Sequence, residues 1–165
     1  MTNPVIQPSK VNRVTVDILR PLLVIAEADS TYSLNDPLAR TVPTALVSQK
    51  GRFILADYPK RGAVYPQIVL SMINTPGSRI DRRDSFYQST ATIRHQILCK
   101  NTTNGHNILN GLIEFYQRDH DDLSEAGLIE PKIAGTSGPT PKDETGTFTF
   151  TLTIECLIYS KYIAP

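Results

Sequence analysis

The chain has 165 residues, with 17 Lys+Arg against 16 Asp+Glu, and a formal net charge of +1. This length suits a single domain whose core stabilises the fold without disulfides or metals. The near-neutral charge argues against a dedicated duplex-DNA binder, which needs a basic surplus to displace counterions from phosphates. No apolar run approaches the ~20 residues that span a bilayer, and residues 1–10 lack the apolar stretch of a signal peptide. We therefore expect that the protein is made in a reducing cytosol and does not associate with a membrane.

The N-terminal third gives the weaker patterns. Residues 1–10 are polar, contain two prolines and are expected to form an extended arm. Apolar residues at helical spacing predict a helix within 17–28 that begins late, because Pro21 is tolerated only in a first helical turn. A strand over 11–19 is the competing interpretation. Residues 38–47 are expected to form a second short helix.

Three later segments predict strands of one antiparallel sheet. Residues 67–73 are apolar on both parities, which indicates either a central strand or one with partial cover on both faces. Residues 90–99 and 147–159 alternate apolar and polar side chains, which predicts one buried and one solvated face. Residues 52–56 are the candidate for a short edge strand.

The clearest helical pattern lies between the last two of these strands. Apolar residues recur three and four apart over 108–118, and the stretch 101–105 is expected to be a turn that caps this helix. Gly111 is expected to let the helix lie close to the sheet, and residues 122–127 predict one further helical turn. The predicted fold class is therefore α+β, with a mostly antiparallel sheet of about four strands and helices packed on one face.

Two long connections interrupt this order. Residues 74–89 are expected to be a hairpin loop far longer than the usual two to five residues, and residues 130–146, rich in Pro, Gly, Ser and Thr, a second loop. Long connections in compact domains are usually functional or disordered. The alternating charges of the first loop serve either solubility alone or docking to a partner. These charged residues are Arg79, Asp81, Arg82, Arg83 and Asp84.

The sequence contains few signs of a catalytic or metal-binding site. The phosphate-loop, dinucleotide, zinc-protease and nucleophile-elbow motifs do not occur in the sequence. His95 and Cys99 lie four residues apart on one predicted strand, about 13 Å, which is too far for a catalytic Cys–His pair. Cys99 and Cys156 are expected to be buried free thiols. Residues 119–122 (DHDD) have metal-ligand types, but adjacent side chains diverge, so we expect a solvated helix end. We expect no catalytic residue, no metal and no cofactor.

Residues 65–71 (YPQIVLS) carry a family resemblance. The segment resembles the Tyr-Pro-x-apolar-apolar strand of the tail-terminator (tail-completion) proteins of tailed bacteriophages. The strand, helix and strand predicted after it follow that family's order, so the resemblance covers most of the chain from about residue 50 onward. The N-terminal third and residues 130–146 have no obvious counterpart in the simplest members, which leaves open a different neck protein of similar fold.

The resemblance implies a structural virion protein of the tail or neck, made in the host cytoplasm and without enzymatic activity. Such proteins form a homo-oligomeric ring, usually of six copies, on the tail-tube protein, and they present a surface to the head–tail connector protein. DNA passes through the lumen without sequence-specific binding. A closed ring needs two different patches on each subunit. We expect them at the 74–89 loop and at Thr149, Thr151 and Thr153, although threonines are also ordinary on a solvated sheet face.

Three alternatives of other classes stay open. The first is a head–tail connector or stopper protein of the neck. The second is a small cytosolic α+β enzyme that uses Cys99 or a histidine, and the third is a nucleic-acid binder. The last of these predicts strongly salt-dependent DNA binding, which the net charge of +1 disfavours.

The charged loop gives a first testable prediction. Replacing Arg79, Arg82 and Arg83 together with alanine is expected to leave the fold intact and to impair assembly, because the substitution removes charge from a loop and not from the core. Circular dichroism checks the fold, and sedimentation checks assembly. Normal assembly of this variant would exclude the loop as a contact.

Overall fold

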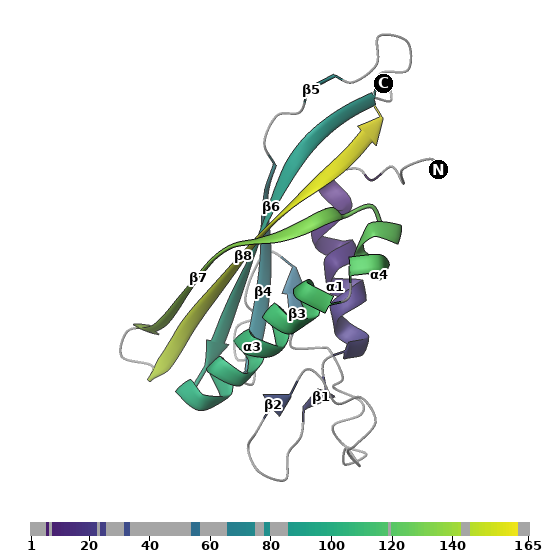
Figure 1. Cartoon of the computed structure of the whole chain (residues 1–165). Coiled ribbons are helices and arrows are strands. Elements are labelled where there is room, and N and C mark those ends of the chain that lie inside the picture. The colour runs from purple at the N-terminus through teal and green to yellow at the C-terminus, as the bar shows by residue number, and fades with distance from the viewer. Residues whose placement is uncertain are drawn as a thin grey trace.

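The structure is a computed structural model that describes residues 6, 8–22, 24–25, 32–33, 54–56, 66–74, 78–79, 86–118, 120–142 and 146–161. Its centre is one twisted sheet with helices on one side (Figure 1). The main strands in spatial order are β3 (Ile54–Ala56), β4 (Gln67–Asn74), β6 (Phe86–Cys99), β8 (Thr147–Lys161) and β7 (Ile129–Lys142). Neighbours are antiparallel except β3 and β4, which are parallel. Two further short strands, β1 (Val24–Ile25) and β2 (Tyr32–Ser33), pair with each other.

The helices share one core with the inner face of the sheet. They are α1 (Val11–Leu22), α3 (Thr102–Arg118) and α4 (His120–Glu125). Alternate residues of the strands point toward them, and residues of all three helices belong to the same buried cluster. The predicted α+β class, with a mostly antiparallel sheet and helices packed on one face, is confirmed.

The longest strand pairing in this sheet joins β6 to β8. The two strands pair over all 14 residues of β6, from Phe86 opposite Lys161 to Cys99 opposite Phe148. The predicted strands were correct in type, and β6 begins four residues earlier than the pattern indicated. Val69 (4% exposed) and Leu98 (3%) are buried on the sheet face opposite the helices, which confirms partial cover on both faces of β4.

The predicted second loop at residues 130–146 is wrong over most of its length. Residues 129–142 form β7, an edge strand that pairs with β8 through three register shifts. Its Pro- and Gly-rich composition has no strand periodicity, so its order comes from the neighbouring β8 and not from its own pattern. Pro131, Pro139 and Pro141 lie on an edge strand, where a missing N–H group is tolerated.

The predicted 74–89 loop is also shorter than expected. β4 extends to Asn74 and β6 begins at Phe86, while β5 (Ser78–Arg79) pairs antiparallel with Gln88 and Tyr87 of β6. Residues 80–85 lie outside the described part of the chain, and so does the predicted helix at 38–47. The candidate edge strand at 52–56 is confirmed as β3.

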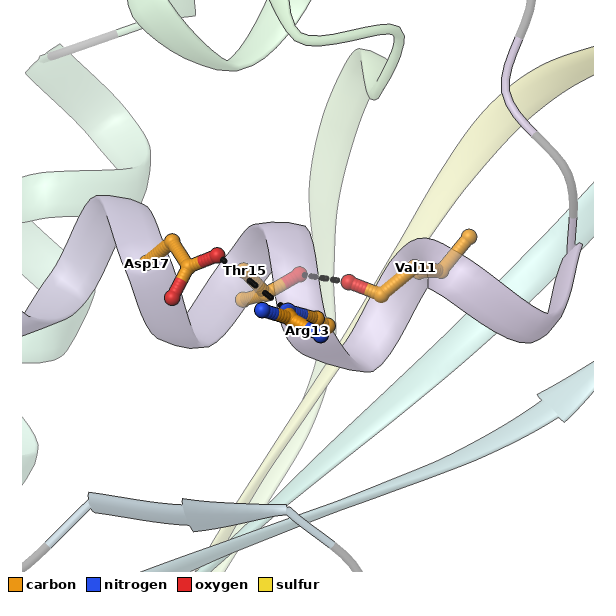
Figure 2. Close-up of polar contacts among 4 residues, drawn as sticks. All are labelled: Val11, Arg13, Thr15 and Asp17. Atoms are coloured by element: carbon orange, nitrogen blue, oxygen red, sulfur yellow. Dashed lines mark hydrogen bonds and ion pairs between the residues drawn. The ribbon is translucent and has the colours of Figure 1, made fainter.

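The first helix differs from its prediction in position. It is a helix and not the alternative strand over 11–19, but it begins at Val11 and ends at Leu22, so Pro21 lies in its last turn. Its buried residues recur at helical spacing, and among them the Thr15 hydroxyl donates to the Val11 carbonyl at 2.9 Å (Figure 2). Proline lacks the N–H group that would continue the hydrogen bonding of the helix, and α1 ends one residue after Pro21.

Three helix boundaries also depart from the predictions. Residues Pro8–Lys10 form a 3-10 helix that leads into α1, so this part of the expected arm is not extended. The expected turn at 101–105 belongs to α3 from Thr102 onward, with the Thr103 amide donating to Asn101 Oδ1 at 2.8 Å as an N-cap. The further turn is α4, which begins at His120 and is followed by Gly127 at φ 95°.

Candidate interaction surface

The three predicted threonines lie together on the outer face of β8. Leu152 and Ile154, which alternate with them, are fully buried under the helices, so Thr149, Thr151 and Thr153 point away from the core. All three are partly exposed. The structure therefore places these residues on one solvent-facing surface, as the parity of the sequence indicated.

Pairing with β7 widens this surface. Thr149 lies opposite Thr140, Thr151 opposite Ser137 and Thr153 opposite Gly135. We call the set Ser137, Thr140, Thr149, Thr151 and Thr153 the threonine patch. It contains no charged side chain, and depletion of charge is characteristic of the central part of protein interfaces. Sequence reasoning missed Ser137 and Thr140, because their strand was not predicted.

Charged and apolar side chains border the patch on the same sheet face. Arg94 lies opposite Thr153, and the next row along the strands brings together Lys132, Glu155 and Thr92, with Ile73 beyond Thr92. Arg94, Lys132 and Glu155 are exposed, and Ile73 is a large apolar side chain with 59% of its surface exposed. The threonine patch is thus an uncharged surface with charged side chains at one of its ends.

Arg79 is the one residue of the predicted charged set that the structure describes, and it lies far from this patch. Arg79 belongs to β5 and lies opposite Tyr87 of β6, whereas Asp81, Arg82, Arg83 and Asp84 lie outside the described residues. Tyr87 and Arg94 are seven residues apart along β6, which corresponds to about 23 Å. The structure thus does not bring Arg79 and the threonine patch together: they lie toward opposite ends of the β6–β8 pair.

Both cysteines are buried thiols that contact backbone carbonyl groups. Cys99 and Cys156 are free and buried, as predicted, and their thiols contact the backbone carbonyls of Phe148 and Ala91 at 3.7 Å. Burial raises the pKa of Cys99, and it raises the pKa of Cys156 to about 12. Both thiols therefore stay protonated near neutral pH, whereas a nucleophilic cysteine needs its thiolate form.

His95 instead pairs with a residue that the sequence analysis did not single out. Its Nε2 atom lies 2.8 Å from the Tyr116 hydroxyl of α3, and both side chains are buried. The helical spacing of apolar residues in 108–118 already placed Tyr116 on the inward face. That spacing was the signal for the contact.

Within the part of the chain that the structure describes, no group of three or more His, Cys, Asp and Glu side chains is arranged to hold a metal ion. No helix there is long and apolar enough to cross a membrane. No protein-family model matches the sequence, and no curated protein matches it. The threonine patch and the long strands that carry it are thus the feature on which a functional proposal can be built.

Proposed function

We propose that this chain is a structural virion protein of a tailed bacteriophage, which forms a ring on the tail tube and joins the tail to the head-side neck. The observation that carries the proposal is the threonine patch, an uncharged surface formed by three alternate residues of β8 and widened by β7. The resemblance of residues 65–71 to the tail-terminator strand supports the choice of family. The proposed partners are further copies of the chain, six in a ring, together with the tail-tube protein and the head–tail connector.

The position of the contact regions also favours a ring. A closed ring uses two different patches on each subunit, and here the threonine patch and β5 lie at opposite ends of the β6–β8 pair. The outer edge of β7 is protected by prolines against the addition of another strand. We therefore propose that neighbouring copies meet through the sheet face and not through strand pairing at β7.

A charge placed in the patch gives the test of this proposal. Thr151→Lys is expected to abolish assembly, because a lysine at the centre of an uncharged interface is buried without a partner when copies associate. The fold is expected to persist, since Thr151 is partly exposed in the single chain. Sedimentation velocity measures assembly, and thermal unfolding measures stability.

The matched control places the same charge elsewhere. Gln117 is exposed on α3, on the helical side of the sheet, so Gln117→Lys should assemble like the unmodified chain. Normal assembly of Thr151→Lys, or equal loss in both variants, would remove the threonine patch as the contact.

A second candidate function is a connector or stopper protein of the same neck. The observation that favours it is β7. Residues 130–146 have no obvious counterpart in the simplest tail terminators, and yet residues 130–142 of this segment belong to a long strand. The two candidates differ in their partners. Pull-down with purified tail-tube protein supports the tail terminator, whereas pull-down with portal-side protein alone supports the connector.

A further inference from the structure

A buried polar pair joins the sheet to helix α3 through the core. The His95 side chain on β6 has no exposed surface, and Tyr116 on α3 is 2% exposed. The two rings meet edge to face, with centroids 5.3 Å apart and an angle of 73° between the ring planes. Their hydrogen bond of 2.8 Å therefore connects two elements that otherwise pack through apolar side chains.

Only one nitrogen of the His95 ring has a hydrogen-bond partner. The Nδ1 atom is buried and has no partner within hydrogen-bond distance and geometry. A neutral imidazole leaves this atom without a hydrogen bond. A protonated ring would place a full charge in the core, which the backbone carbonyl groups of Leu152 and Ile93 offset only in part. The protonated ring raises the free energy of the closed structure far more than the neutral ring does. Burial accordingly lowers the pKa of His95 from 6.5 to about 4.

Among the residues that the structure describes, none places a compensating negative charge beside His95. Its strand partners are Leu70 on β4 and Leu152 on β8. The titratable groups nearby are Tyr116 on α3 and Cys156 on β8, and burial raises the pKa of each, so both stay neutral in acid. Among the buried side chains that the structure describes, including those of α1 and α4, none is Asp, Glu, Lys or Arg.

We propose that the His95–Tyr116 pair is an acid-sensitive latch, in which protonation of His95 releases helix α3 from the sheet while β6 and β8 stay paired. The sheet side is the firmer one, because backbone hydrogen bonds join β6 to β8 along 14 residues. Helix α3 is held by side-chain packing, so its movement is the easier way to bring His95 into water.

The direction of the pH effect follows from the two protonation equilibria. The pKa of His95 is lower in the closed state than in water, so the open state binds more protons between pH 6.5 and 4. The closed state therefore loses stability as the pH falls through this window. Between pH 7 and pH 5 the opening equilibrium of α3 should increase about 20-fold.

Hydrogen–deuterium exchange of the full chain tests the latch. At pH 5, after correction for the intrinsic exchange rate, amides of α3 should exchange about 20-fold faster than at pH 7, with β6 and β8 unchanged. His95→Gln, which is neutral at both pH values, should remove this difference. His106→Gln is the matched control, because His106 is exposed on α3, and this variant should keep the full response.

Three results would overturn the proposal. They are equal loss of protection in α3 and in the β6–β8 pair, an unchanged α3 at pH 5, and a His95→Gln variant that responds like the unmodified chain. If His95→Gln does not fold, an NMR titration of the unmodified chain decides. His95 that stays neutral until about pH 4 supports the latch, and a His95 pKa of 6.5 contradicts it.

Discussion

Gly105→Ala should destabilise the fold by about 3 kcal/mol, even though alanine is favoured over glycine by ~1 kcal/mol in an open helical position. Gly105 lies near the start of α3, where the helix backbone comes close to side chains of the sheet. A Cβ atom there would overlap the ring of Phe150 and lie 2.7 Å from the Cys99 sulfur. Both side chains are buried, so neither has open space to move into. Denaturant unfolding measures the change in free energy.

A control and a rescue define this prediction. Gly135→Ala is the control, because a Cβ atom at Gly135 meets nothing within 4 Å, and its stability should change by less than about 1 kcal/mol. Phe150→Leu should restore part of the loss when combined with Gly105→Ala, since it removes the ring that the new methyl group overlaps. Full stability of Gly105→Ala, or strictly additive losses in the double variant, would show that this close approach does not exist.

Gly138→Ala should be about as destabilising, at about 3 kcal/mol, but for a different reason. Gly138 lies on β7 at φ +118°, a backbone conformation that side chains disfavour. A Cβ atom there would lie 2.8 Å from the Thr149 carbonyl oxygen and 2.9 Å from the Phe150 Cα atom. These obstacles are backbone atoms of β8, so the expected result is separation of β7 from β8 at this end. Faster amide exchange in residues 135–142 measures it.

Phe150→Leu, which should partly rescue Gly105→Ala, should not rescue Gly138→Ala. Phe150→Leu leaves the Thr149 carbonyl and the Phe150 Cα atom in place, so it should restore little stability to Gly138→Ala. Gly135→Ala again serves as the control on the same strand. Recovery of Gly138→Ala by Phe150→Leu would contradict the backbone origin of the effect.

The sequence allowed the strands that bury one face to be predicted, because alternation is a local signal. Residues 147–159 and 90–99 contain it, and both are strands in the structure. β7 could not be predicted in this way, because its sequence does not alternate and its strand conformation depends on pairing with β8. It also contains Gly138, whose positive φ is a conformation that favours glycine. The threonine patch was consequently predicted only on β8, and its β7 half was missed.

Helix boundaries were less predictable than helix faces. Pro21 was taken as the start of a helix and instead lies in the last turn of α1, because the buried positions of Val11, Thr15 and Leu19 begin the helix earlier. Gly105 was assigned to a turn, so its close approach to the sheet was not foreseen. The close approach predicted at Gly111, a buried residue of α3, remains a prediction.

Negative-stain electron microscopy of the purified full chain is the most direct test of the proposed assembly. The chain should be imaged alone and after mixing with tail-tube protein, at concentrations where sedimentation detects association. Closed rings of uniform diameter, alone or at the tube end, are the predicted result. A chain that stays strictly monomeric under both conditions would contradict it.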